Sequence, residues 1–165
     1  MGRNKYGESP RKQRVRKLGL ALFILYVLVL IYLLFMSEIH DHVIGLHEEY
    51  HYNLVPFLEI RRFIRARKSL GFKAVFLNLF GNVLGFMPFG FFLPVITPRM
   101  NNPVRTIAAG AVVSACVEVT QLITRIGRFD VDDILLNTLG AALGYLLFTL
   151  LNAIRRKLYG ESETV

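Results

Sequence analysis

The sequence ILLNTLGAALGYLLFTLLNAI, residues 134–154, contains no charged residue, and its two amide side chains are Asn137 and Asn152. An α-helix rises about 1.5 Å per residue, so about 20 residues cross the roughly 30 Å hydrocarbon core of a bilayer. This stretch therefore predicts a transmembrane helix. A soluble fold would instead spread its apolar residues at the period of a helix or a strand.

Three other stretches have the length and composition of transmembrane helices: residues 18–36, 74–96 and 104–124. The first is longer than the apolar core of a signal peptide and lacks a clean cleavage site, so we expect a retained signal anchor. The remaining two also contain polar residues, among them Asn78 and Asn82 in the first and Glu118 and Gln121 in the second. The sequence therefore predicts an all-α membrane protein with four transmembrane helices.

The basic residues lie mainly at the ends of the apolar stretches. The chain has a net charge of +8 and a pI near 9.9. Because of their position, these residues indicate anionic lipid headgroups as partners, and not nucleic acid. Residues 1–17 carry seven Lys or Arg residues, and we expect them to form a disordered cytoplasmic tail. A cytoplasmic N-terminus places twelve of the 20 Lys and Arg residues on the inner side.

This orientation places residues 37–73 outside the cell and the C-terminal tail, residues 155–165, in the cytoplasm of a multi-pass inner-membrane protein. Within the outer loop, the segment FLEIRRFIR, residues 57–65, separates apolar from basic residues at roughly helical spacing. It predicts a short amphipathic helix on the outer leaflet. A solvated loop with accidental periodicity is the alternative.

Polar residues inside the apolar stretches are costly, at roughly 2.5–3.5 kcal/mol for a carboxylate at the centre of a span. The rise per residue places those of the last three helices in the outer half of the bilayer, below the loop at residues 125–133. We expect them to line a ligand-binding pocket, although a hydrogen-bond network that only holds the bundle together remains an alternative. The predicted site consists of Asn78, Asn82, Glu118, Gln121, Arg128, Asp130, Asp133 and Asn137.

Glu118 needs a partner in this setting, and the candidates are Asn82, Arg125, Arg128 or its own protonation. Small residues four apart, such as Gly81 with Gly85 and Gly140 with Gly144, predict close approach between helix backbones.

Four segments resemble motifs of VanZ-like membrane proteins. They are NLFGNVLGFMPFGFFLP (residues 78–94), EVTQ (118–121), GRFDVDDILLNTLG (127–140, continued by Gly144) and NLVPF (53–57). Their order and spacing make the resemblance specific over residues 53–151. It implies a multi-pass membrane protein of Gram-positive bacteria, from a family named for low-level resistance to the lipoglycopeptide teicoplanin. The resemblance carries no settled biochemical activity.

Several functions remain open. The pocket could bind an amphiphile, either a lipoglycopeptide or a lipid-linked cell-wall intermediate. Alternatively, an enzyme acting on an envelope lipid or glycan could use Glu118 as an acid and Asp133 as a base. Transport by an oligomer is a further alternative.

We expect no cofactor and no bound metal. The acidic loop at Asp130, Asp132 and Asp133 could hold a divalent cation. We favour instead ion pairs with Arg125 and Arg128, with Asp130 or Asp132 as the N-cap of the fourth helix. The segment His47-Glu48-Glu49-Tyr50-His51 matches the zinc-protease pattern His-Glu-x-x-His, but no third ligand is evident. A plain solvated loop is the favoured interpretation of that segment.

Overall fold

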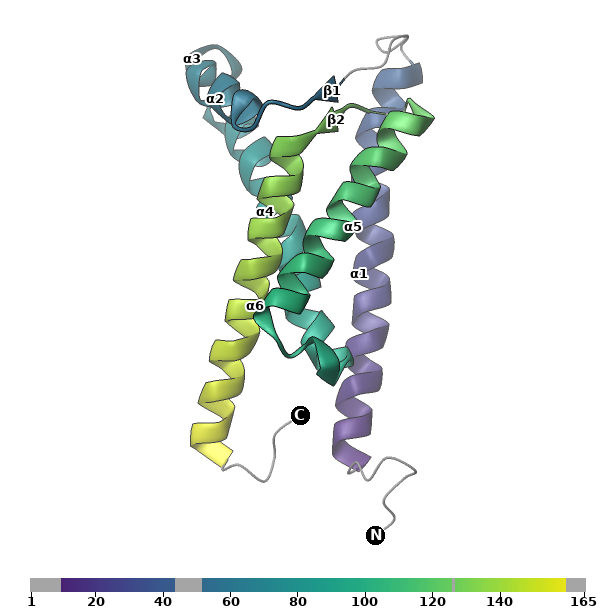
Figure 1. Cartoon of the computed structure of the whole chain (residues 1–165), viewed down its shortest axis with the longest axis vertical. Coiled ribbons are helices and arrows are strands. Elements are labelled where there is room, and N and C mark those ends of the chain that lie inside the picture. The colour runs from purple at the N-terminus through teal and green to yellow at the C-terminus, as the bar shows by residue number, and fades with distance from the viewer. Residues whose placement is uncertain (1–9, 44–51, 126, 160–165) are drawn as a thin grey trace.

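The computed structural model describes residues 10–43, 52–125 and 127–159. Four of its helices are long and apolar enough to span a membrane. They are α1 (Pro10–Val43), α4 (Phe72–Ile96), α5 (Pro103–Thr124) and α6 (Val131–Tyr159). Successive spans run in alternating directions, so that the start of α1 and the end of α6 lie at the same end of the bundle (Figure 1). The prediction of four helices of membrane-spanning length is confirmed.

The first helix begins earlier than expected. We expected residues 1–17 to be disordered, but α1 begins at Pro10, so that prediction was wrong for residues 10–17. Proline is favoured in the first turn of a helix, and the Arg, Lys and Gln residues that follow have high helix propensity. The remaining part of that tail (residues 1–9), the end of the C-terminal tail (residues 160–165) and the His47–His51 motif lie outside the described residues.

Short elements gather at the other end of the bundle. Strands β1 (Tyr52–Asn53) and β2 (Phe129–Asp130) form a parallel pair in which Asn53 is aligned with Asp130. Helices α2 (Leu58–Arg65) and α3 (Arg67–Leu70), which precede α4 in the chain, lie at the same end as this pair (Figure 1). We call this the β-pair end of the bundle. The opposite end carries the short 3₁₀ helix η1 (Pro98–Met100), which connects α4 to α5.

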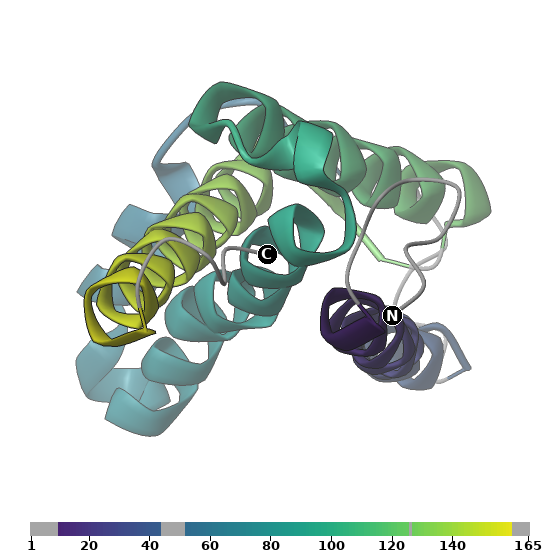
Figure 2. The same ribbon diagram turned by 90° about the horizontal axis from the view of Figure 1, so that it is seen from below.

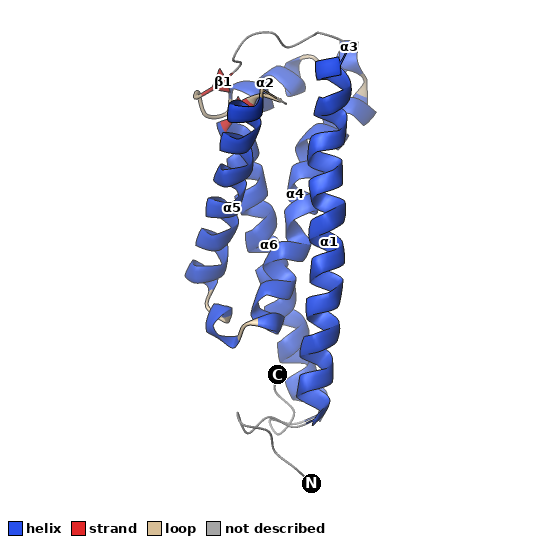
Figure 3. Cartoon of the chain, turned by 90° about the vertical axis from the view of Figure 1, so that its right-hand side faces the viewer, coloured by secondary structure: helices blue, strands red, loops and turns tan. Residues whose placement is uncertain are grey.

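The closest helix packing joins α4 to α6, which run in the same direction although α5 separates them in the chain (Figure 3). A Cβ atom added at Gly140 would lie 2.2 Å from the carbonyl oxygen of Val83, and one at Gly144 would lie 2.0 Å from that of Met87. These glycines therefore permit backbone contact, as their spacing suggested. Gly81 does not, because no atom lies within 4 Å of a Cβ added there.

Helix α1 packs mainly on α4 and stands at the side of the other helices (Figures 2 and 3). The Tyr26 hydroxyl donates a hydrogen bond of 2.7 Å to the carbonyl oxygen of Gly85 on α4. Phe86, Phe89 and Ala141 form the buried centre of the bundle, and Leu30 of α1 packs against it. This contact holds α1 against α4 and α6.

Candidate functional site

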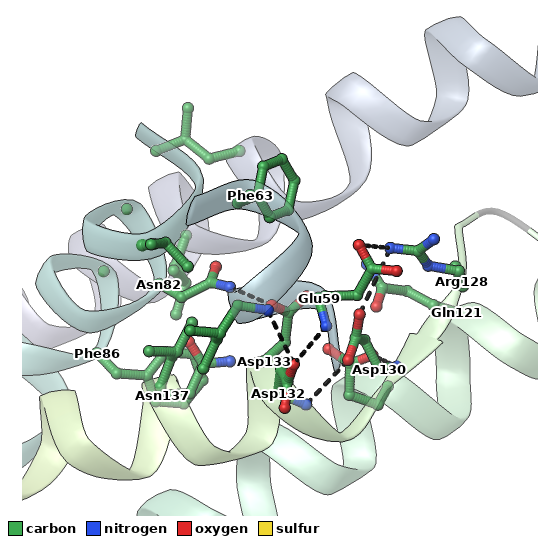
Figure 4. Close-up of a pocket in the computed structure, with 18 residues that line it drawn as sticks. Glu59, Phe63, Asn82, Phe86, Gln121, Arg128, Asp130, Asp132, Asp133 and Asn137 are labelled. Atoms are coloured by element: carbon green, nitrogen blue, oxygen red, sulfur yellow. Dashed lines mark hydrogen bonds and ion pairs between the residues drawn. The ribbon is translucent and has the colours of Figure 1, made fainter. Parts of the chain in front are cut away.

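A pocket of about 370 Å³ lies at the β-pair end, between α1, α2, α4, α5, β2 and α6 (Figure 4). Seven of the eight side chains in the predicted site line it: Asn82, Glu118, Gln121, Arg128, Asp130, Asp133 and Asn137. Asn78 lies in α4, but its side chain is outside the described part of the structure. The fold therefore brings together polar residues from three helices, from strand β2 and from the loop before it.

Asp132 connects the pocket to α2. One carboxylate oxygen accepts a hydrogen bond from the backbone N–H of Phe57 at 2.5 Å. The other accepts from the backbone N–H groups of Glu59 and Ile60, at 2.9 and 3.1 Å. A helix N-terminus presents unpaired N–H groups and a partial positive charge, both of which a carboxylate satisfies. The side chain of Phe57, the N-cap residue of α2, makes no capping hydrogen bond. The carboxylate of Asp132 on α6 therefore caps α2.

Asp130 organises the junction between β2 and α6. Its Oδ1 accepts from the backbone N–H of Asp132 at 2.9 Å, which makes it the N-cap of α6, one of the two residues expected there. The same oxygen accepts from the Asn53 amide at 3.0 Å, across the β1–β2 pair. Burial raises the pKa of the Asp130 carboxyl, and these hydrogen bonds and the charge of Arg128 partly oppose the increase.

Glu118 is only 3% exposed, and its Oε2 accepts a hydrogen bond of 2.8 Å from the backbone N–H of Asp130. Sequence spacing could not reveal this backbone partner. Asn82, which we had considered for Glu118, instead donates a hydrogen bond of 2.5 Å to Asp133 Oδ1. Hydrogen bonds thus connect α5 to β2 and β2 to the start of α6. A further hydrogen bond connects α6 to α4.

Asn137 lies one helical turn beyond Asp133 on α6, and the residue is 2% exposed. Its amide nitrogen donates to the Ser114 hydroxyl on α5 at 2.9 Å. Its amide oxygen is buried and has no hydrogen-bond partner within the described residues. Leaving this buried acceptor unpaired costs about 1–3 kcal/mol.

Two charged pocket residues were absent from the predicted site, Glu59 and Asp132. Glu59 is buried on α2, with Oε1 3.2 Å from a guanidinium nitrogen of Arg62 and Oε2 3.4 Å from one of Arg128. Arg128 also lies 3.4 Å from Asp130. The spacing of Glu59 and Arg62 was visible in the sequence, but only the docking of α2 shows that Glu59 faces the pocket.

Apolar side chains complete the pocket. Leu30 and Leu33 come from α1, Phe63 from α2, and Leu79 and Phe86 from α4. The site therefore has a polar wall beside an apolar one. In the described part of the chain, no three His, Cys, Asp or Glu side chains are arranged to hold a metal ion.

The family model described as VanZ/LLP1 matches residues 23–152, which include every residue that lines the pocket. The chain belongs to the VanZ/LLP1 family. The resemblance inferred from its motifs is thereby confirmed, and with the four long apolar helices it identifies a VanZ-like multi-pass membrane protein. No curated protein and no solved structure matched the chain.

Proposed function

We propose that this VanZ-like protein binds the polar headgroup of an amphiphilic cell-envelope molecule in the pocket at the β-pair end. The observation that carries the proposal is the composition of the pocket wall. Polar side chains from α4, α5 and α6 face the same cavity as Leu30 and Leu33 of α1. An amphiphile could place its headgroup among the polar groups and its acyl chain along the leucines.

The volume of the pocket supports ligand binding over a hydrogen-bond network that only holds the helices together. Interiors pack at nearly crystalline density, so polar groups that only join helices would close around one another. Here a cavity of about 370 Å³ remains beside them, within the range of small-molecule sites. In addition, ionisable groups in membrane spans are costly and usually mark functional sites.

We place the β-pair end on the outer side of the cell membrane and both termini in the cytoplasm. The support is the excess of Lys and Arg at the opposite end, where α1 starts and α6 ends. In this orientation α2 lies at the outer leaflet. Its Arg61, Arg62 and Arg65 are exposed, as interaction with anionic headgroups requires.

The ligand in this proposal is either a lipoglycopeptide antibiotic or a lipid-linked cell-wall intermediate, and binding of either gives low-level teicoplanin resistance. We do not propose catalysis. The two carboxylates of the enzyme alternative each hold a part of the fold together. Glu118 accepts a hydrogen bond from the backbone N–H of Asp130, and Asp133 accepts one from the Asn82 amide.

The test expresses wild type and two matched variants in a susceptible Gram-positive host and measures the inhibitory concentrations of teicoplanin and vancomycin at equal membrane levels. Gln121→Leu removes an amide from the pocket wall, whereas Asn152→Leu removes one at the opposite end of α6. We expect wild type and Asn152→Leu to raise the teicoplanin value and Gln121→Leu to lose the increase. Equal values for all three would contradict a role of the pocket in resistance.

A further inference from the structure

The pocket has a strong excess of negative charge. Arg128 is the one basic side chain in its described lining. The carboxylates that line it are Glu59, Glu118, Asp130, Asp132 and Asp133. Charges interact strongly where water is excluded, so this lining disfavours an anionic ligand group and favours a cationic one.

The unpartnered amide oxygen of Asn137 indicates which kind of cation the pocket binds. An amide oxygen accepts hydrogen bonds, so its missing partner is an N–H or O–H donor. Asp133 lies one turn away on the same face of α6, and Glu118 lies one turn from Ser114, the hydroxyl that holds the Asn137 amide nitrogen. A donor at Asn137 would therefore lie close to two carboxylates.

We propose that the pocket accepts a primary ammonium group of its amphiphilic ligand and that this ammonium donates a hydrogen bond to Oδ1 of Asn137. This inference rests on the proposed function, and it adds the chemical class of the headgroup. A primary ammonium offers three N–H donors and a positive charge, which match the orphan acceptor and the acidic lining together. A quaternary ammonium carries the charge without the donors, and a phosphate alone carries the wrong charge.

The test compares two phospholipids that differ in those donors. Full-length protein is reconstituted in nanodiscs of phosphatidylglycerol containing equal small fractions of phosphatidylethanolamine and phosphatidylcholine. Native mass spectrometry then measures which lipid stays bound. We expect phosphatidylethanolamine to be preferred by about tenfold, because a hydrogen bond with a charged donor contributes that much to affinity.

Asn137→Leu should reduce the preference to near parity, and Asn152→Leu at the opposite end of α6 should retain it. The wild-type comparison needs no variant, so it remains decisive even if Asn137→Leu does not fold. Equal retention of the two lipids by wild type, at levels that Gln121→Leu lowers for both, would overturn the ammonium inference and leave the binding function standing. Equal retention of the two lipids by wild type that Gln121→Leu leaves unchanged for both would overturn the inference and the proposed function together.

Discussion

The carboxylate of Asp132 lies 2.9 Å from the backbone nitrogen of Glu59, although 73 residues separate them in the chain. This contact fixes the N-terminus of α2 on the N-terminus of α6. It also turns Glu59 and Phe63 toward the pocket, where both contribute to the lining. The wall that α2 provides thus depends on a charge carried by another helix.

Replacing Asp132 with alanine should release the start of α2. The change leaves the N–H groups of Phe57, Glu59 and Ile60 without their acceptor, and we expect a loss of about 2–4 kcal/mol in local stability. Hydrogen–deuterium exchange of residues 57–60 should become faster, while exchange in the middle of α5 stays unchanged. Unchanged exchange at residues 57–60 would show that the cap does not hold α2.

Gly140→Ala should destabilise the bundle by about 1–3 kcal/mol, because the added methyl group meets the backbone of α4 and forces the helices apart. Gly81→Ala is the matched control, since its methyl group meets no atom within 4 Å and alanine favours a helix. Thermal unfolding in detergent measures both. A destabilisation of equal size in the two variants would contradict the assigned α4–α6 contact.

The orientation can be tested with single cysteines in a Cys116→Ser background. Leu54 is exposed at the β-pair end, and Arg99 is exposed in η1 at the opposite end. A membrane-impermeant maleimide should label Leu54→Cys on intact cells and Arg99→Cys only after permeabilisation. The reverse pattern would place the pocket on the cytoplasmic side.

Asp130 should make stability depend on pH in a defined direction. Burial raises its folded-state pKa above the ordinary value of 3.8, so the native state binds the proton more readily than the unfolded state. The contribution of this group to the free energy of unfolding therefore increases as the pH falls from neutrality through the raised pKa toward 3.8. Melting curves between pH 7 and pH 4 should show this trend for wild type relative to Asp130→Asn. A difference between the two proteins that moves in the opposite direction would contradict the direction of the pKa shift.

The spans and most of the site could be predicted from the sequence because both depend on local properties. Length and apolarity define a span, and the rise per residue sets the depth of Asn82, Glu118 and Asn137. The capping of α2 by Asp132 and the pairing of Asn53 with Asp130 could not be predicted. Both join segments more than 70 residues apart. The first uses backbone N–H groups, which nearly every residue carries, and the second joins two side chains that meet only once the strands pair. The helical start of α1 could not be predicted from charge alone, because a run of basic residues is compatible with both a disordered tail and a helix.

The most direct test of the central claim measures binding of an amphiphile to the pocket itself. Wild type, Gln121→Leu and Asn152→Leu are immobilised in nanodiscs, and surface plasmon resonance measures the binding of teicoplanin and of a lipid-linked cell-wall intermediate against empty nanodiscs. We predict that wild type and Asn152→Leu bind at least one of the two ligands above the empty-nanodisc level, and that Gln121→Leu binds it about tenfold more weakly. Binding of both ligands that is the same for all three proteins, or no greater than to empty nanodiscs, would contradict the claim.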